Sequence, residues 1–181
     1  MQKESGFSLV ELMVVVAIIG VLASVAIPSF MRNKNNAKTA EVPVNIKGIF
    51  EGAIAYYGQT QFNKSNYKIK DPKFPNSAGL TPGFRCCKGD TSFKCDPSNK
   101  GPRGYDGAKK WGKTAWLNLQ FKMQDRHLFR YQYKKISNDA FQAIARGDLD
   151  CDGNESLYFR VGKAVNGEVN GTELLREGSE E

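Results

Sequence analysis

The sequence predicts an α+β protein in which a long N-terminal helix packs on an antiparallel β-sheet head. Three observations lead to this fold class. The chain opens with an apolar run from Leu12 to Met31, twenty residues without a charge, which is the length that a helix needs to cross a bilayer. Apolar residues then recur at helical spacing between Ile46 and Tyr57. Beyond residue 115, short segments alternate apolar and polar residues with short loops between them, which indicates an antiparallel meander.

A single acid, Glu11, stands at the head of the apolar run. A carboxylate beside hydrocarbon is costly, so one that is kept there is by default a functional residue with a partner. A short polar leader, residues 1–6, precedes the run and ends at Gly6, directly before the first aromatic residue, Phe7.

Two plainer interpretations explain less. A secretory signal calls for a positively charged start, whereas the one positive charge of Lys3 is outweighed by Glu4 and Glu11. The apolar stretch also continues past Ala26, where such a signal would be cut. A plain membrane anchor accounts for the length of the run but for neither Glu11 nor the Gly6-Phe7 junction.

The segment from Gly6 to Pro28 resembles the N-terminus of the type IV pilins and their prepilin-like relatives. The resemblance implies the pilin fold, cleavage by a prepilin peptidase between Gly6 and Phe7, and methylation of the new Phe7 amine. It also implies that Glu11 is the glutamate used in assembly. An ion pair between Glu11 of one subunit and the Phe7 amine of a neighbour would satisfy both half-buried charges and penalise a wrong register.

The same resemblance implies the partners and the location of the chain. It would form a helical filament with further copies of itself and with other pilins, assembled by an inner-membrane platform. Before assembly it would contact membrane lipid, crossing the inner membrane once with the head outside the cytoplasm. It would afterwards lie in an extracellular filament.

The predicted helix has two parts, a hydrophobic part over 7–31 for the membrane or the filament core and an amphipathic part over 32–59. The stripe of the second part is Ile46, Ile49, Phe50, Ala53, Ile54 and Tyr57. Pro28 and Pro43 interrupt the run, and each removes a backbone hydrogen bond. Pro43 could either kink one helix or separate two.

Residues 60–181 are expected to form the head. The stretch from 59 to 112 holds five prolines and three of the four cysteines, so we expect a long connection there rather than regular structure. Alternation predicts strands at 115–121, 128–133, 140–145 and 157–161, the last with an extension over 165–169.

Four cysteines in a domain delivered across a membrane indicate two disulfides. Adjacent cysteines rarely bridge each other, so two pairings remain open. They are Cys86–Cys95 with Cys87–Cys151, and Cys87–Cys95 with Cys86–Cys151. A zinc site is the alternative, but it suits a cytosolic protein better.

An acidic loop surrounds Cys151. Its spacing matches the first half of a D-x-D-x-D-G calcium loop, with candidate ligands Asp148, Asp150, Asp152 and Asn154. The twelfth position is Phe159 instead of a glutamate, so the alternative is a plain acidic turn between strands. A structural calcium ion is the one cofactor that the sequence raises.

The net charge of +7 is concentrated between Lys64 and Lys135, where seventeen Lys or Arg face five Asp. Such a surface could bind nucleic acid or an anionic polysaccharide, although it is more often a solvated face. No catalytic constellation is present, and the single histidine, His127, is expected to be a surface residue beside a turn. We therefore expect no enzyme.

These observations predict a structural subunit of a type IV pilus or pilus-like filament. Two alternatives stay open. One is a type II secretion pseudopilin, which shares the N-terminus. The other is a membrane-anchored protein that binds DNA or polysaccharide without polymerising.

Overall fold

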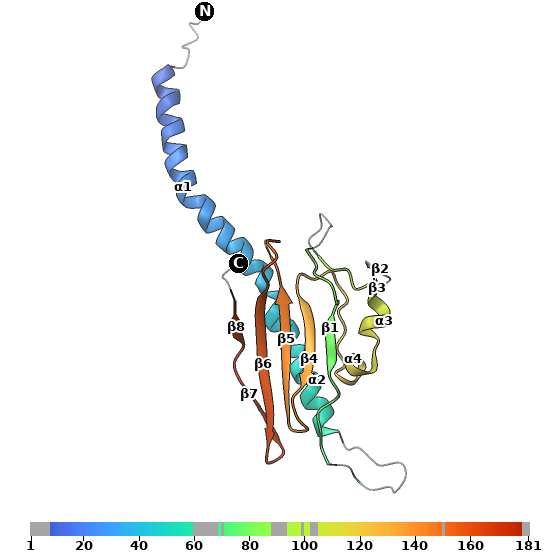
Figure 1. Ribbon diagram of the computed structural model, residues 1–181. Coiled ribbons are helices and arrows are strands. Elements are labelled where there is room, and N and C mark those ends of the chain that lie inside the picture. Colours follow the sequence, from blue (N-terminus) through green and yellow to red (C-terminus); the bar gives the residue numbers. More distant parts are fainter. Residues whose placement is uncertain are drawn as a thin grey trace, which may run out of the picture. The chain divides into compact units, whose positions relative to one another are not determined.

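The computed structural model describes residues 8–59, 69, 71–87, 94–98, 100–101, 105–149 and 151–178. Three predicted site residues, Gly6, Phe7 and Asp150, lie outside the described residues. The chain forms two compact units, Met1–Thr39 and Ala40–Glu181, whose elements are labelled in Figure 1.

The first unit contains one helix, α1 (Leu9–Thr39). It is built from Val, Ile, Leu and Ala up to Met31 and becomes polar from Arg32 onward. The helix continues through Pro28.

The second unit begins with α2 (Glu41–Gly58). Pro43 lies in the first turn of α2, where a missing N–H is tolerated because the first N–H groups of a helix have no partner within the helix. Of the two outcomes open for Pro43, the structure therefore has separate helices, with a turn at Ala40 between them.

The predicted stripe forms the inner face of α2. Its buried residues are Val42, Ile46, Ile49, Phe50 and Ala53, and Tyr57 packs against the same core. Ile54 was expected in this stripe but is 37% exposed. It follows Ala53 by one residue, a step of about 100° that turns its side chain away from the sheet.

Among the described residues, six strands form one antiparallel sheet. They are β1 (Ala78–Thr81), β4 (Arg130–Lys135), β5 (Ala140–Gly147), β6 (Ser156–Val165), β7 (Glu168–Gly171) and β8 (Leu175–Glu177). The order is β1-β4-β5-β6-β7, with β8 also paired to β6. The predicted meander is confirmed in β4 to β6, since each of these strands pairs with the next. The predicted extension of the last strand over 165–169 is wrong, because the chain turns at Asn166 and Gly167 and returns as β7, antiparallel to β6.

One face of the sheet covers α2, which contacts β5 and β6 (Figure 1). The ring of Phe141 in β5 lies 5.0 Å from that of Phe50 in α2 and 4.6 Å from that of Phe74. Tyr133 of β4 is fully buried, with its ring 5.4 Å from that of Phe141. Aromatic packing thus joins the helix to the sheet.

The strand predicted at 115–121 is wrong. The segment forms a short helix, α4 (Thr114–Asn118), after α3 (Gly107–Trp111). Trp116 and Leu119, three residues apart, are both 1% exposed, whereas Leu117 between them is 61% exposed. Burial at helical spacing overrides the alternation that suggested a strand.

The stretch predicted to be irregular also contains regular pieces. β1 lies in it and forms the edge of the main sheet beside β4. A second pair of short strands, β2 (Lys100–Gly101) and β3 (Tyr105–Asp106), is separate from that sheet. These strands have two to four residues, too few for a recognisable alternation.

Candidate functional site

Glu11 lies in the first turn of α1. Its Oε2 accepts a hydrogen bond from the backbone N–H of Ser8 at 2.9 Å. This is the glutamate half of a capping box, in which the third helical residue reaches back to the residue before the helix. The Ser8-x-x-Glu11 spacing ahead of an apolar run is the sequence signal for this contact, which was not among the predictions.

The Glu11 carboxylate keeps capacity for a second partner. An ionised carboxylate offers about four lone-pair positions, and one N–H occupies one of them. The positive end of the α1 dipole also favours a negative charge at this place. The Glu11 carboxylate can therefore accept a further hydrogen bond or a cation from outside the chain.

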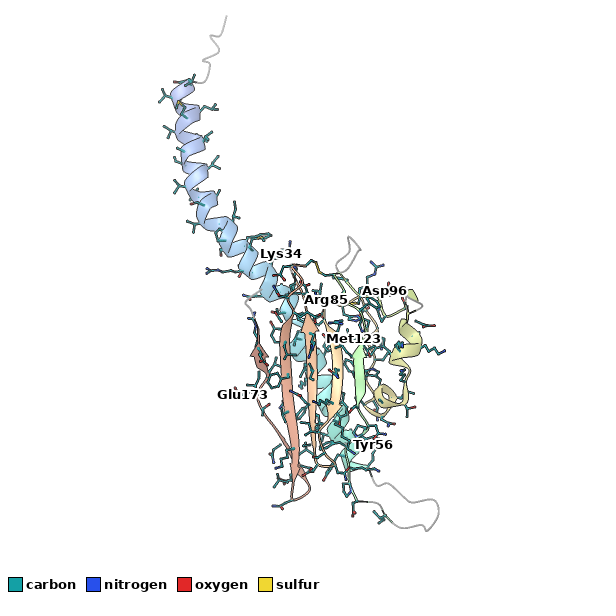
Figure 2. All side chains as sticks on the ribbon, viewed as in Figure 1. Lys34, Tyr56, Arg85, Asp96, Met123 and Glu173 are labelled. Carbon is teal, nitrogen blue, oxygen red and sulfur yellow. A yellow bond between two sulfur atoms is a disulfide. The ribbon has the colours of Figure 1, made fainter. Side chains whose placement is uncertain are left out.

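The apolar surface of α1 is uncovered. Every large apolar side chain from Leu9 to Met31 is exposed, with values between 48% for Val15 and 73% for Leu9. Figure 2 shows these side chains projecting outward along the helix. The helical stretch that begins at Leu9 is long and apolar enough to cross a membrane by length and composition. Lipid or other copies of such a helix can cover a surface of this kind.

The acidic loop is held by its own side chains and backbone. Asp148 Oδ2 accepts from the Gly153 N–H at 3.1 Å, and the two oxygens of Asp152 accept from the backbone and side-chain nitrogens of Asn154 at 2.7 and 2.8 Å. Asp148 Oδ1 is buried and has no hydrogen-bond partner among the described residues. The loop therefore has one buried carboxylate oxygen to spare.

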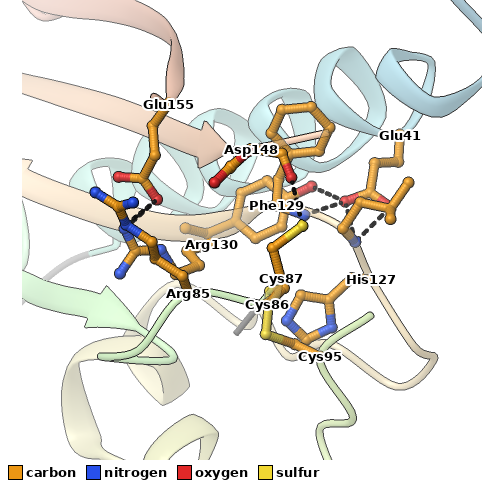
Figure 3. Close-up of a disulfide and its surroundings, with 12 residues drawn as sticks. Glu41, Arg85, Cys86, Cys87, Cys95, His127, Phe129, Arg130, Asp148 and Glu155 are labelled. Carbon is orange, nitrogen blue, oxygen red and sulfur yellow. Dashed lines mark hydrogen bonds and ion pairs between the residues drawn. A yellow bond between two sulfur atoms is a disulfide. The ribbon is translucent and has the colours of Figure 1, made fainter. Parts of the chain in front are cut away.

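Arginines border the acidic loop. Arg85 Nη1 donates to the Gly153 carbonyl oxygen at 2.6 Å, and its Nε lies 3.9 Å from Glu155. Glu155 also forms an ion pair with Arg130, which is only 7% exposed (Figure 3). These contacts tie the loop to β4 and supply positive charge next to the aspartates.

The structure contains the disulfides Cys86–Cys95 and Cys87–Cys151, the first of the two pairings left open by the sequence. Cys87 Sγ also contacts the Asp148 carbonyl oxygen at 3.0 Å. The Cys86–Cys95 bridge closes a short loop within the connection between α2 and β4 (Figure 3). The Cys87–Cys151 bridge ties that connection to the loop that follows β5.

A second glutamate, which the sequence analysis did not single out, lies in the first turn of α2. Glu41 accepts hydrogen bonds from the N–H groups of Leu128 and Phe129 at 3.1 and 2.9 Å, and from the Tyr131 hydroxyl at 3.0 Å. Asn45 donates to the same hydroxyl oxygen at 2.8 Å. Burial raises the pKa of the Glu41 carboxyl, and these hydrogen bonds oppose that shift.

His127 is not the surface residue that was expected. It is 1% exposed and lies between the rings of Trp111 and Tyr131, at centroid distances of 5.9 and 6.3 Å. Burial lowers the pKa of its imidazole, so the neutral form is favoured.

Comparisons with known proteins bear on the N-terminus and on the head. Residues 1–27 match the family model described as a prokaryotic N-terminal methylation motif. The chain is 35% identical over 80 residues to the type IV major pilin protein PilA of Myxococcus xanthus. This alignment covers 44% of the chain and 33% of the Myxococcus protein.

Two further relatives align over a longer segment. Identity to the type II secretion system core protein G of Vibrio cholerae is 30% over 121 residues, which covers 65% of this chain and 69% of that protein. Identity to the core protein G of Pseudomonas aeruginosa is 42% over 116 residues, or 64% of each chain. No solved structure matches the chain at a significant level.

Proposed function

The chain belongs to the family of type IV pilins and type II secretion pseudopilins, and on that premise we propose that it is a structural subunit of a type IV pilus or pilus-like filament. Members of this family are structural proteins, not enzymes. The observation that carries the proposal is α1, whose apolar surface is exposed on all sides and whose first turn holds the Glu11 carboxylate.

The apolar surface of α1 and its Glu11 carboxylate have separate roles in assembly. Lipid tails are as apolar as the helix, so moving α1 from lipid into a filament gains little from the hydrophobic effect. Packing and charge pairing must therefore select the assembled state. Glu11 pairs with the Phe7 amine of a neighbouring subunit, and a register that leaves either charge unpaired costs several kcal/mol.

Processing creates that amine. A prepilin peptidase cleaves between Gly6 and Phe7, removes residues 1–6 and methylates the new N-terminus. The match of residues 1–27 to the methylation motif supports this step. Until assembly, the apolar part of α1 lies in the inner membrane, and the head, with its two disulfides, lies on the oxidising side.

A type II secretion pseudopilus is the second candidate, and a specific observation favours it. The alignments with core protein G of Vibrio cholerae and Pseudomonas aeruginosa span 121 and 116 residues, whereas the alignment with the Myxococcus pilin spans 80. The head therefore contributes more to the alignments with core protein G. Both candidates use α1 and Glu11 in the same way.

Substitution of Glu11 tests assembly. We expect Glu11→Ala to remain in the membrane and to be lost from filaments, because the Phe7 amine would have no counter-charge in the packed core. Glu168→Ala, which removes an exposed acid of β7, is the matched control and should assemble normally. Normal amounts of Glu11→Ala in intact filaments would refute this role of Glu11. A native chain that is absent from filaments and stays in the membrane would instead favour a membrane-anchored binding protein.

Filament composition distinguishes the two candidates. Surface filaments are sheared from cells and the chain is quantified in them by mass spectrometry, together with its N-terminal peptide. A pilus subunit should be present in the sheared fraction and begin with methylated Phe7. A chain that stays with the envelope, and whose deletion blocks protein secretion, would be a pseudopilin.

The acidic loop supports a subordinate proposal, a structural calcium ion held by Asp148 with Asp150, Asp152 and Asn154. The buried free oxygen of Asp148 fits a cation, and each Asp152 oxygen has a second lone pair besides the one that its hydrogen bond to Asn154 uses. Calcium should raise the unfolding midpoint of the full chain relative to a chelator, and Asp148→Asn should abolish the difference. An equal response of the variant would exclude this site.

A further inference from the structure

One disulfide has a histidine against it. Cys86 Sγ, Cys95 Sγ and a ring nitrogen of His127 all lie within 4.8 Å of one another (Figure 3). The backbone sets this arrangement, because Cys95 and His127 face each other in an isolated antiparallel bridge. The Cys95 N–H donates to the His127 carbonyl oxygen at 2.8 Å, and the His127 N–H donates to the Cys95 carbonyl oxygen at 3.0 Å.

One nitrogen of the His127 ring lies against the backbone, as is usual in a metal-binding histidine. Its Nδ1 lies 3.2 Å from the Asp125 carbonyl oxygen, which can only accept a hydrogen bond, so the proton belongs on Nδ1. Nε2 then carries a lone pair, and it is buried without a hydrogen-bond partner among the described residues. A backbone carbonyl that holds one ring nitrogen and thereby frees the other is the usual support of a metal ligand.

We propose that the dithiol form of this chain holds Zn²⁺ between Cys86, Cys95 and His127. A dithiol reductant supplies two electrons and two protons to the Cys86–Cys95 bond and is itself oxidised to a disulfide. Zn²⁺ then displaces the two thiol protons and binds two thiolates and the His127 imidazole. A water molecule completes the tetrahedral set of four ligands.

The dimensions suit this ion. Zn–S bonds of about 2.3 Å and Zn–N bonds of about 2.0 Å place tetrahedral ligand atoms roughly 3.5–3.8 Å apart. The three ligand atoms lie within 4.8 Å of one another, which is close to these separations. Thiolate and imidazole together favour Zn²⁺ over Ca²⁺ or Mg²⁺. Cys86 is only partly buried, which leaves an entry path for the ion.

The site gives the reduced head a way to hold the same loop before the bridge forms. The ion would join Cys86 and Cys95 to the β-bridge at His127, the positions that the disulfide joins later. The second pair, Cys87 and Cys151, has no comparable third ligand among the described residues. It therefore provides an internal control. The inference does not depend on the proposed function.

The test uses the full chain in detergent micelles, in two variants that each keep one cysteine pair. Cys87→Ser with Cys151→Ser keeps the pair beside His127, and Cys86→Ser with Cys95→Ser keeps the other pair. Each is reduced with a phosphine and titrated with Co²⁺ and then Zn²⁺. We expect the first variant to bind one Co²⁺ with tetrahedral and thiolate-to-metal absorption bands, and to exchange it for one Zn²⁺.

Substitution of His127 distinguishes a specific Zn²⁺ site from nonspecific binding of Zn²⁺ to the two thiols. In the background that keeps Cys86 and Cys95, His127→Ala and His127→Gln should each weaken Zn²⁺ binding by at least about tenfold, since one of three protein ligands is lost. His127→Gln retains most of the side-chain volume and guards against a packing effect. The disulfide-bonded form of the same background should bind no Zn²⁺.

Several results would overturn the inference. These are equal Zn²⁺ affinity in the two cysteine backgrounds, unchanged affinity in both His127 variants, or binding by the oxidised protein. Circular dichroism accompanies each titration. A reduced Cys87→Ser/Cys151→Ser chain that stays unfolded with Zn²⁺ present would also refute it, because the site requires the Cys95–His127 bridge.

Discussion

Two glutamates occupy the same position in their helices, the first turn, and have different surroundings. Glu11 in α1 accepts one N–H and is otherwise exposed among apolar side chains. Glu41 in α2 accepts two N–H groups and a hydroxyl from its own head. The Glu11 carboxylate is therefore available to another molecule, whereas the Glu41 carboxyl oxygens are used as hydrogen-bond acceptors within the fold.

Glu41 should make the stability of the head depend on pH. Its folded-state pKa is raised above 4.5, so the folded state binds a proton more tightly than the unfolded chain does. The stabilisation from this group is present below pH 4.5 and is lost as the pH rises through the folded pKa. Glu41→Gln should remove this dependence. Unfolding in urea, followed by the fluorescence of the buried Trp111 and Trp116, measures it.

Glu41→Ala is the contrasting substitution. It leaves the N–H groups of Leu128 and Phe129 without their acceptor, so we expect a loss of about 2–3 kcal/mol in unfolding free energy. Glu51→Ala, at an exposed pair with Lys47 on the same helix, should cost less than about 0.5 kcal/mol. Similar losses in the two alanine variants would contradict the role given to Glu41.

At the level of elements, the close approach of α2 to the turn after α4 decides how the helix sits on the head. A Cβ placed on Gly52 would lie 1.9 Å from the Leu119 carbonyl oxygen. Backbone of one element thus fills the space that a side chain of the other would need. At Gly48, one turn earlier, a Cβ would meet only the Phe121 ring, at 3.5 Å.

Alanine at these two glycines should have opposite effects. Gly52→Ala forces α2 and Leu119 apart, and we expect it to lower the unfolding free energy by at least about 2 kcal/mol. Gly48→Ala meets an ordinary contact and should gain up to about 1 kcal/mol from helix propensity. Urea unfolding of both variants measures the difference, and equal midpoints would show that α2 can shift without cost.

At the level of the whole molecule, long-range links hold the head together. The Cys87–Cys151 bridge joins residues 64 apart in the sequence, and Cys86–Cys95 joins residues 9 apart. Ion pairs of Glu155 with Arg85 and Arg130 reinforce the Cys87–Cys151 link. They join the loop before β6 to β4 and to the connection that precedes β4. Both disulfides thereby constrain the long connection between α2 and β4.

The loss of unfolding free energy on removal of each disulfide should depend on the length of the loop that the disulfide closes. In the chain-entropy account, replacing Cys87 and Cys151 by serine costs about 4 kcal/mol and replacing Cys86 and Cys95 about 2.5 kcal/mol. Urea midpoints of the two double variants, taken in oxidising buffer without zinc, test this order. A larger loss from the shorter loop would show that the native contacts of Cys95, and not the loop entropy, dominate.

The first unit should contribute little to the stability of the second. All buried side chains among the described residues lie at or beyond Val42. A chain truncated to residues 40–181 should therefore be soluble without detergent and unfold at the same urea concentration as the full chain. A urea midpoint lowered by more than about 0.5 M would mean that residues before Ala40 support the core. The usual m-value of about 1–3 kcal/mol per molar converts that shift into a loss of unfolding free energy.

Local patterns along the chain were sufficient for the apolar helix with Glu11, the stripe of α2, the meander from β4 to β6 and the presence of two disulfides. Each of these depends on residues within a few positions of one another, or on simple cysteine chemistry. Long-range contacts were needed for the rest. Burial of Trp116 and Leu119 made a helix of residues 114–118, and β1 exists because β4 lies beside it. The surroundings of Glu41 and the position of His127 against the Cys86–Cys95 bridge come from segments far apart in the sequence, so no local spacing could have revealed them.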